Sequence, residues 1–241
     1  MLNIALPKGR LGESVLEKFA RAGYVFPKLE SGDRRLVIPS VSGNASFFLV
    51  KPSDVPVYVE YGVADVGVAG RDVLMESGAD VYELIDLEIG KCRIAVAGKK
   101  DFSDDTDRLL RVATKFPNVA KRYFAARNRD IEVIPLHGSI EIAPILGLTD
   151  VIVDIVETGK TLRENGLDVL FDIADVSARL IANKPASKFK SDEVSALVRA
   201  LTEDMKNAEN CLWRAQNECR TRGSGYEQIR IGRKGHHQRR L

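Results

Sequence analysis

DVIVDIVETGKTL, residues 150–162, joins an apolar run to a polar turn, and the interpretation of the whole chain depends on it. Residues 150–156 are mostly Val, Ile and Asp and are predicted to form a strand. The turn that follows ends in Gly159-Lys160-Thr161, like the last residues of a nucleotide-binding P-loop. The first question is therefore whether this stretch is a P-loop and, if not, what it holds.

The turn does not complete the P-loop pattern, which requires a glycine five residues before Gly159. That position is Asp154, and the missing glycine matters because it allows backbone N–H groups to wrap around phosphates. A carboxylate there would repel a phosphate unless a cation lay between them, so a P-loop NTPase is excluded. Acids at Asp154 and Glu157, then a flexible turn and hydroxyls, fit a ligand with a phosphate at one end and sugar hydroxyls or Mg²⁺ at the other. An ordinary strand-to-helix turn capped by Thr158 explains the local pattern equally well.

The composition favours a soluble globular protein. The chain has 241 residues, of which 44% are hydrophobic, enough to bury one large core or two small ones. There is no apolar run of membrane-spanning length, and residues 1–5 lack the basic and apolar regions of a signal peptide. Cys92, Cys211 and Cys219 show neither metal-ligand spacing nor an even disulfide framework. We therefore expect a cytoplasmic protein with no membrane partner.

The net charge of +2 hides an asymmetry along the chain. Residues 214–241 contain eight Lys or Arg and two Glu, which leaves 28 of the 36 basic and 32 of the 34 acidic residues in the body. Because the body is mildly acidic, its charge does not indicate nucleic-acid binding. The basic, polar segment 213–241 is expected to be a disordered tail, and an RNA-contacting tail is the less favoured alternative.

Strand-like and helical segments alternate, which predicts an α/β protein with a largely parallel sheet. Strands are expected at 2–7, 64–70, 92–98, 131–136 and 150–156, and as a hairpin of 34–39 with 45–52. Helices are expected at 11–24, 53–62, 71–78, 139–147 and 191–216, with two helical pieces at 107–128 split at Pro117. Two long extended runs, 86–98 and 167–183, have few turn signals. We expect them to join two lobes, with a ligand in the cleft between the lobes at the carboxyl ends of strands.

Positive charge follows several of the expected strands. Lys8, Gly9 and Arg10 open a helix after the first strand, where they could meet an anion, although a basic turn is equally consistent. Arg34 and Arg35 precede a strand, where arginine is more often simply solvated, and Lys51 ends another strand.

Other residue types are less informative. Glycines at 62, 67 and 70 surround the strand 64–70, where either a planar ligand or close strand–helix packing would require them. His137 is the body's only histidine, and a lone histidine is more often structural than catalytic. Without Ser–His–Asp, HExxH or clustered Cys/His spacing, a hydrolase or zinc site is not supported.

Five stretches, taken together in this order, resemble the ATP phosphoribosyltransferase family, the first enzyme of histidine biosynthesis. They are LPKGRL (6–11), DRRL (33–36), PSDVPVYVEYGVADVGVAGRDVL (52–74), GKCRIAVA (90–97) and HGSIEIAPILGLTDVIVDIVETGKTL (137–162). The resemblance extends over about residues 1–210. It implies an α/β, two-lobed fold like type II periplasmic binding proteins, with the ligand cleft between the lobes. The implied reaction transfers the phosphoribosyl group of phosphoribosyl pyrophosphate (PRPP) to N1 of ATP, releases pyrophosphate and needs Mg²⁺.

The resemblance also assigns domains and site residues. Lobe I, on the ATP side, is expected to be 1–89 plus 178–212, lobe II with the PRPP loop 90–177, and the tail 213–241. The expected PRPP contacts are Asp154, Glu157, Thr158, Gly159, Lys160, Thr161 and Leu162, with Asp154 also the candidate contact of Mg²⁺. The expected ATP contacts are Leu6, Lys8, Gly9, Arg10, Gly67, Gly70, Asp72, Lys91, Cys92, Arg93 and Glu141. Arg34, Lys8 and Lys51 are expected to be catalytic by neutralising pyrophosphate or the ATP phosphates.

The family has a long form with a C-terminal histidine-sensing domain and a short form that works with a regulatory subunit. About 30 residues follow the predicted long helix, which resembles the short form. The implied partners are a second copy in a homodimer and a subunit resembling histidyl-tRNA synthetase, in a hetero-octamer. Lys51 stands where family members often carry Arg, which weakens a bidentate phosphate contact there. A solute-binding module with the same fold is the alternative function, but it needs a signal peptide and no acidic phosphoribosyl loop.

Overall fold

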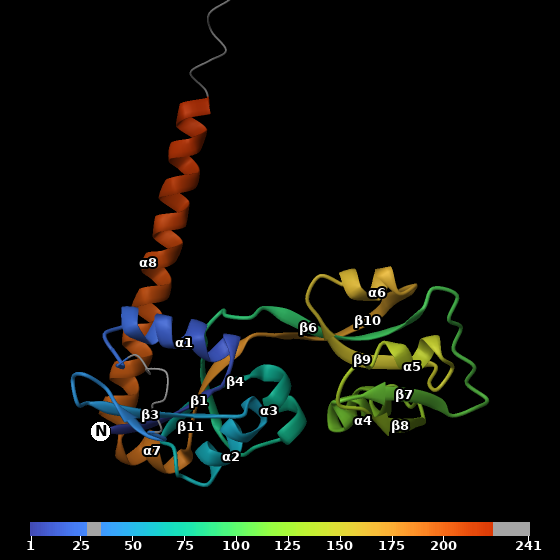
Figure 1. Ribbon diagram of the computed structural model, residues 1–241, viewed down its shortest axis with the longest axis horizontal. Helices are drawn as coiled ribbons and strands as arrows, with labels where there is room; N and C mark the ends of the chain where they lie inside the picture. The colour runs from blue at the N-terminus through green and yellow to red at the C-terminus, as the bar shows by residue number, and fades with distance from the viewer. Residues whose placement is uncertain (28–34, 224–241) are drawn as a thin grey trace, which may run out of the picture.

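The computed structural model describes residues 1–27 and 35–223, with side chains through Ala208. Figure 1 shows two α/β lobes side by side, joined by extended segments, and one long helix that leaves lobe I and projects away from both lobes. Within the described residues, no helix is both long and apolar enough to cross a bilayer.

Lobe I is built on a six-stranded sheet with the order β2-β3-β1-β4-β11-β5. Its strands are β1 (Leu2–Pro7), β2 (Ile38–Pro39), β3 (Ala45–Val50), β4 (Val66–Gly70), β5 (Tyr82–Asp86) and β11 (Ala178–Ala182). β1 runs parallel to β3 and β4, whereas β11 runs antiparallel to β4 and β5, and β2 antiparallel to β3.

Helices cover both faces of this sheet. They are α1 (Arg10–Arg21), the 3₁₀ turn η1 (Pro52–Asp54), α2 (Val55–Glu60), α3 (Arg71–Ser77), α7 (Lys184–Phe189) and α8 (Ser191–Gly223). Side chains alternate along β1, so Ile4 packs with Phe19 of α1 and Leu197 of α8, while Ala5 packs with Val59 of α2 on the other face. The apolar run 2–7 is therefore buried on both faces.

Lobe II is built on a five-stranded sheet with the order β10-β6-β9-β7-β8. Its strands are β6 (Cys92–Lys99), β7 (Leu110–Thr114), β8 (Ile131–Pro135), β9 (Val151–Val156) and β10 (Leu167–Val176). Its helices are α4 (Pro117–Ala125), α5 (Ile142–Ile145) and α6 (Lys160–Glu164). β9 again alternates: Val153 packs on the α4 side with Val119, and Ile152 packs on the other side with Ala143 of α5.

Two connections join the lobes, as the two long extended runs predict. Residues 87–91 lead from β5 to β6, and Ser177 alone separates β10 from β11. The connections lie side by side, because Ala178 N–H donates to Ile89 O and Leu87 N–H donates to Ala178 O, each at 2.9 Å. We call residues 87–91 and 176–178 the hinge.

Away from the hinge, α3 of lobe I meets α4 of lobe II. The Glu76 carboxylate accepts hydrogen bonds at 3.0 Å from the backbone N–H groups of Asn118 and Val119, at the start of α4. Asn118 Nδ2 donates to Glu76 O at 3.0 Å, and the Arg122 guanidinium donates to Met75 O. The lobes are therefore tied together at a second point, which we call the α3–α4 tie.

Two secondary-structure predictions are wrong. Residues 110–114 form strand β7 and not a helix, because β7 pairs with β8 and β9 in parallel and buries Val112 and Ala113. Both sheets are mixed and not largely parallel, since the chain crosses between the lobes twice and each crossing strand enters antiparallel. Strands 2–7, 92–98, 131–136 and 150–156 are confirmed to within about one residue.

The tail boundary also needs correction. Helix α8 continues to Gly223, whereas the disordered tail was expected from residue 213. Residues 213–222 are mostly Arg, Gln, Glu and Ala, which are good helix formers, so the helix extends until a glycine. Residues 224–241 and the segment 28–34, which includes Arg34, lie outside the described residues.

Candidate active site between the lobes

The turn between β9 and α6 has the geometry of an open backbone cradle. Gly159 has φ 69° and ψ 12°, a left-handed conformation that strongly favours glycine. Thr158 Oγ1 accepts a long hydrogen bond of 3.4 Å from Lys160 N–H. Among the described residues, the backbone N–H groups of Thr158 and Gly159 have no acceptor. The turn therefore offers N–H donors and a hydroxyl to a ligand.

A cavity of about 220 Å³ lies under this turn. It is lined by Ala95, Ala97, Glu141, Ile152, Asp154, Ile155, Val156, Thr161 and Leu162. The small alanines of β6 leave room, and the carboxylates of Asp154 and Glu141 supply acceptors. Leu162 is largely buried in the lobe II core, so it closes the cavity through apolar packing. Glu141, expected on the ATP side, lies here in lobe II.

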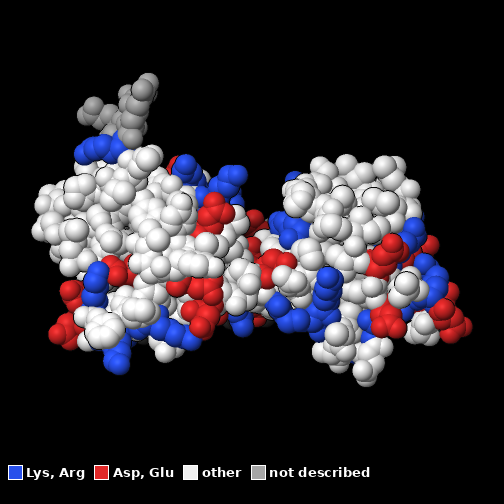
Figure 2. Space-filling model, turned by 90° about the horizontal axis from the view of Figure 1, so that it is seen from below, with Lys and Arg blue, Asp and Glu red and all other residues white. Residues whose placement is uncertain are grey.

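A second cavity, of about 420 Å³, lies between the lobes at the hinge. Lobe I contributes Arg10, Leu11, Ser14, Gly70 and Asp72; the hinge and β6 contribute Ile89, Gly90, Cys92, Val176, Ser177 and Ala178; and lobe II contributes Ile155 and Glu157. It thus brings residues of the expected ATP set, Arg10, Asp72 and Cys92, to the same space as Glu157 of the expected PRPP set. Figure 2 shows the narrow waist between the lobes, with basic and acidic side chains beside it.

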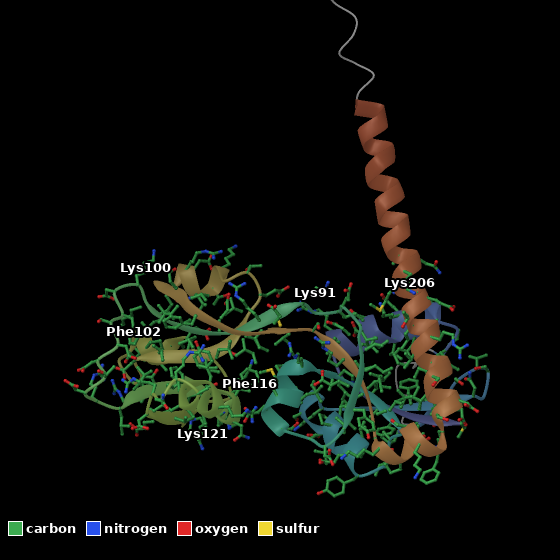
Figure 3. The ribbon with its side chains drawn as sticks, turned by 180° about the vertical axis from the view of Figure 1, so that it is seen from behind. Lys91, Lys100, Phe102, Phe116, Lys121 and Lys206 are labelled. Carbon is green, nitrogen blue, oxygen red and sulfur yellow. The ribbon has the colours of Figure 1, made fainter. Side chains whose placement is uncertain are left out.

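A third cavity, of about 350 Å³, opens between the lobes beside the α3–α4 tie. Its lining is Ser53, Asp72, Val73, Glu76, Ser77, Lys115, Phe116 and His137. Figure 3 labels Phe116 at this junction. His137, set aside in the sequence as a lone histidine, faces this space, because the chain turns there after β8.

Asp72 lines both interlobe cavities. Burial raises the pKa of its carboxyl, while the backbone N–H groups of Val73 and of Asp72 itself and the ammonium of Lys115 oppose the rise. A Cβ on Gly70 would lie 2.2 Å from Asp72 Oδ1, so glycine is needed at 70 to leave this carboxylate its place.

Lys115 is a site residue that the sequence patterns did not single out. Its Nζ lies 3.1 Å from Asp154 Oδ1. Lys115 directly follows β7, and because that segment was predicted to be a helix, its position at a strand end was not recognised. A strand prediction for 110–114 would have placed Lys115 at a strand's carboxyl end, where ligands of α/β sheets bind.

Two of the expected ATP contacts lie in the protein interior. Leu6 is fully buried in the lobe I core and can offer ATP no side-chain contact. A Cβ on Gly67 would lie 2.7 Å from Val59 Cγ2 and 2.9 Å from Val55 Cγ1. The close strand–helix packing that was one of the two explanations for the glycine at 67 is therefore present.

The remaining expected residues lie at strand ends or in the hinge. Lys8 and Lys51 are exposed neighbours, since Lys8 N–H donates to Val50 O at 2.8 Å where paired strands β1 and β3 end. Gly9 has φ 88° and precedes α1. Lys91 pairs with Glu88 at 3.5 Å in the hinge, and Arg93 pairs with Asp172 at 2.7 Å on the neighbouring strand β10.

The residues that the structure describes do not form a metal site by themselves. Within the described part of the chain, no group of three or more His, Cys, Asp or Glu side chains could hold a metal ion. Asp154, the candidate Mg²⁺ contact, is already balanced by Lys115. Mg²⁺ is often held by one or two carboxylates plus substrate phosphates, and Asp154 with Glu157 fits that more modest role.

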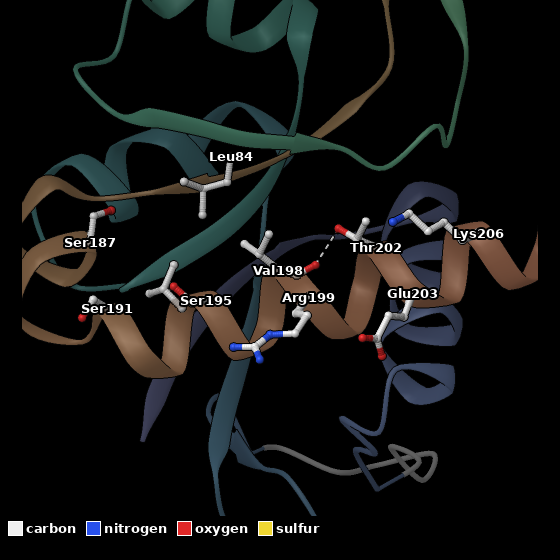
Figure 4. Close-up of a pocket in the computed structure, with 10 residues that line it drawn as sticks. Leu84, Ser187, Ser191, Ser195, Val198, Arg199, Thr202, Glu203 and Lys206 are labelled. Atoms are coloured by element: carbon white, nitrogen blue, oxygen red, sulfur yellow. Dashed lines mark hydrogen bonds between the residues drawn. The ribbon is translucent and has the colours of Figure 1, made fainter.

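A further hollow, of about 550 Å³, lies elsewhere, along α8 (Figure 4). It is lined by Leu84, Ser187, Ser191, Val194, Ser195, Val198, Arg199, Thr202, Glu203 and Lys206. The Thr202 hydroxyl donates to Val198 O of its own helix at 2.8 Å. Because this hollow contains none of the strand-end residues, it is not the candidate site.

Known proteins resemble this chain over most of its length. The profile of the HisG family, described as ATP phosphoribosyltransferase, matches residues 51–203. The ATP phosphoribosyltransferase of Brachyspira hyodysenteriae is 52% identical over 204 residues, covering 84% of this chain and 99% of that protein. The ATP phosphoribosyltransferase of Caldicellulosiruptor bescii is 51% identical over 212 residues, covering 84% and 100%.

Solved structures agree. One chain of the ATP phosphoribosyl transferase (HisG:HisZ) complex from Thermotoga maritima superimposes with a TM-score of 0.76 at 36% identity, covering 86% of this chain and 100% of that one. The periplasmic aliphatic sulphonate binding protein SsuA of Escherichia coli superimposes with a TM-score of 0.53 at 14% identity, covering 90% and 75%. The latter shares the fold alone, and the expected two-lobed architecture is confirmed.

Proposed function

This chain belongs to the ATP phosphoribosyltransferase family, which catalyses the first step of histidine biosynthesis, and we propose that its lobe II holds PRPP while lobe I and the hinge hold ATP. The single observation that carries this division is the hinge-side cavity of about 420 Å³. There the basic and acidic groups of lobe I, Arg10 and Asp72, face Glu157 of the lobe II turn. Two substrates bound on opposite walls would meet in that space.

The PRPP side follows from the turn and the cavity beneath it. The exposed N–H groups and hydroxyls of residues 158–161 suit the 5′-phosphate. The carboxylates of Asp154 and Glu157 suit the ribose hydroxyls, which donate hydrogen bonds to them. Mg²⁺, which would be held by these carboxylates together with the substrate phosphates, would supply positive charge against the phosphates.

The ATP side follows from the basic strand ends of lobe I. Lys8 and Lys51 lie beside each other and Arg10 opens α1, so together they can neutralise phosphate groups. Arg34 stays a proposed catalytic residue on the family resemblance. Gly70, Asp72, Lys91, Cys92 and Arg93 would surround the nucleoside.

The attack of N1 on C1 requires electrostatic stabilisation more than it requires a general base. N1 of adenine has a free lone pair at neutral pH, so the attacking atom needs no deprotonation. The N1–C1 bond forms as the bond from C1 to pyrophosphate breaks, and its electron pair leaves with pyrophosphate. Positioning the two substrates and stabilising the leaving charge should therefore dominate catalysis.

The test combines an assay and one matched pair of variants. Full-length protein mixed with ATP, PRPP and Mg²⁺ should produce phosphoribosyl-ATP, seen as new ultraviolet absorbance. Thr158→Val should weaken PRPP binding about tenfold, the effect of one lost hydrogen bond to a charged group, with ATP affinity unchanged. Thr106→Val, in an exposed turn of the same lobe, is the control. Unchanged PRPP affinity in Thr158→Val would refute the loop assignment, and ligand binding without product would favour a solute-binding module.

The same family membership suggests partners and location. The Thermotoga maritima relative was solved as a HisG:HisZ complex. We infer a comparable regulatory partner here, resembling histidyl-tRNA synthetase, in a hetero-octamer that includes a homodimer of this chain in the cytoplasm. Light scattering of the chain alone and mixed with such a partner would show a dimer and an octamer, and a monomer in both samples would refute the assembly.

A further inference from the structure

Lys115 borders the interlobe cavity beside the α3–α4 tie, and its ammonium contacts an acid that lines the cavity under the lobe II turn. β7 pairs with β9 in parallel register, with Thr114 beside Val153. The next residues along the two strands are Lys115 and Asp154, whose Nζ and Oδ1 atoms are 3.1 Å apart. Asp154 lines the cavity under the turn, and Lys115 lines the interlobe one.

The ion pair is not what holds this strand end in place. The buried Thr114 hydroxyl donates to Val153 O at 2.6 Å and accepts from Phe116 N–H at 2.9 Å, so the backbone on both sides of Lys115 is fixed. The side chains of Lys115 and Asp154 are 38% and 23% exposed. A pair at this exposure contributes at most about 1 kcal/mol, so the ammonium can leave it at little cost.

Binding of the donor changes the charge balance at Asp154. Ribose hydroxyls or Mg²⁺ that engage the Asp154 carboxylate compete with the ammonium for the same oxygens. An ammonium beside Mg²⁺ would also be repelled. Lys115 then needs another anion within reach of its flexible stem.

The bound donor itself carries such an anion. The free ribose hydroxyls that would contact Asp154 are on C2, which is bonded to C1, and on C3, one carbon farther away, and C1 carries the pyrophosphate. The Lys115 ammonium, which lies 3.1 Å from Asp154 in the free protein, is therefore separated from the leaving group by about the width of one sugar ring. From the same position its side chain borders the interlobe space, into which pyrophosphate would depart.

We propose that Lys115 is a further substrate-binding residue of this reaction: it balances Asp154 before PRPP binds and passes to the pyrophosphate group once PRPP occupies the site. The proposal rests on the proposed function. As the bond from C1 to pyrophosphate breaks, the electron pair moves to the pyrophosphate oxygen, and the Lys115 ammonium stabilises the growing negative charge.

The experiment separates pyrophosphate from the rest of the donor. Titration calorimetry with Mg²⁺ measures binding of PRPP, inorganic pyrophosphate and ribose 5-phosphate to full-length wild type, Lys115→Met and Lys115→Arg. Lys115→Met should weaken PRPP and pyrophosphate binding about tenfold or more, since one charged contact is lost, and should leave ribose 5-phosphate binding unchanged. Lys115→Arg should restore most of the affinity. Lys121→Met, at an exposed position of α4 labelled in Figure 3, is the matched control and should bind all three ligands like wild type.

Three outcomes would overturn the proposal. An equal loss for ribose 5-phosphate and PRPP would mean that Lys115 only positions Asp154. The same conclusion would follow if Lys115→Met caused no further loss of pyrophosphate affinity in an Asp154→Asn background. A wild-type protein that binds PRPP and forms product while Lys115→Met binds PRPP equally well would refute this inference alone. A wild type that neither binds PRPP nor forms product would refute the proposed function instead.

Discussion

The turn after β1 in lobe I and the turn after β9 in lobe II share one plan and carry opposite charge. In each, a buried strand ends, a glycine takes positive φ and a helix begins, with φ 88° at Gly9 and 69° at Gly159. Lobe I surrounds its glycine with the exposed bases Lys8 and Arg10. In lobe II the acids Asp154 and Glu157 precede the glycine, and the one basic residue of the turn, Lys160, is paired with Glu164 at 3.7 Å.

This difference teaches that the backbone of such a turn does not identify its ligand. Open N–H groups such as those of Thr158 and Gly159 suit any phosphate, so the backbone geometry alone does not choose between phosphate ligands. The flanking charge discriminates: bases suit a polyphosphate, and carboxylates suit the hydroxyls of a sugar beside its phosphate. The four predictions below alter one lobe, or the contact between them, at a time.

Removing the negative charge of the lobe II site should have the largest effect. Asp154→Asn keeps the size of the side chain but loses the carboxylate that would face ribose, so kcat/KM should fall by about 10²–10³-fold. Steady-state kinetics with both substrates measures this. Asp168→Asn, whose carboxylate pairs with Lys100 at 3.8 Å on β10, is the control. A loss of less than about tenfold would mean that the lobe II carboxylate is not a main contributor to catalysis.

Loosening the contact between the lobes should affect both substrates together. Glu76→Ala removes the acceptor of two backbone N–H groups of α4, each at 3.0 Å. Loss of such charge-assisted bonds should raise both KM values about tenfold and increase the radius of gyration in small-angle scattering. Glu132→Ala, exposed on β8, should change neither quantity. If only one KM rises, the α3–α4 tie serves one site and not the approach of the lobes.

Neutralising the lobe I turn should produce the mirror image of the Thr158→Val effect. Arg10→Ala should raise KM for ATP about fivefold to tenfold through loss of one charged contact, with PRPP affinity unchanged. Kinetics at saturating PRPP and direct PRPP titration give the two values. Equal weakening of both substrates would contradict a division of labour between the lobes.

The smallest effect should be on stability, at Asp72 between the lobes. Burial raises the pKa of its carboxyl above the ordinary value of 3.8, so the folded state holds the proton more tightly than the unfolded state. The contribution of Asp72 to the stability of the folded state is therefore fully present at pH values below the ordinary pKa. It is lost as the pH rises through the raised pKa of the folded state. Asp72→Asn should therefore melt a few degrees higher than wild type at neutral pH, and the two curves should converge in acid.

Calorimetry across that pH range makes the measurement, with Asp101→Asn in an exposed turn as control. A constant difference in melting temperature at all pH values would show that the Asp72 charge is not its cause. Asp72→Asn should also lose activity if Asp72 contacts ATP. That result would show that the wild-type carboxylate lowers the stability of the protein and is needed for its function.

Much of the fold was accessible from local patterns. The apolar runs 2–7, 92–98 and 150–156 form strands because they are rich in Val, Ile, Leu and Ala, which can be buried on both faces of a sheet. The strand 110–114 was not accessible, because DRLLRVAT places its apolar residues at spacings that suit a helix as well. Pairing with β8 and β9 decides in favour of a strand, and Arg111 in that strand is satisfied by Asp150, 39 residues away.

The sequence by itself determined the chemistry of the two turns. In one turn Gly159 lies between the hydroxyls of Thr158 and Thr161 and follows Asp154, and in the other Gly9 lies between Lys8 and Arg10; folding alters neither order. Folding set which of these groups meet. Glu157 faces Asp72, and Lys115 touches Asp154, because strands distant in sequence end at the same sheet edge and two crossings bring the lobes' edges together. Leu6 and Gly67 show the converse: both lie in stretches that match the family, but folding buries the Leu6 side chain in the lobe I core and packs Gly67 closely against Val59, because strand side chains alternate between faces and helices cover both.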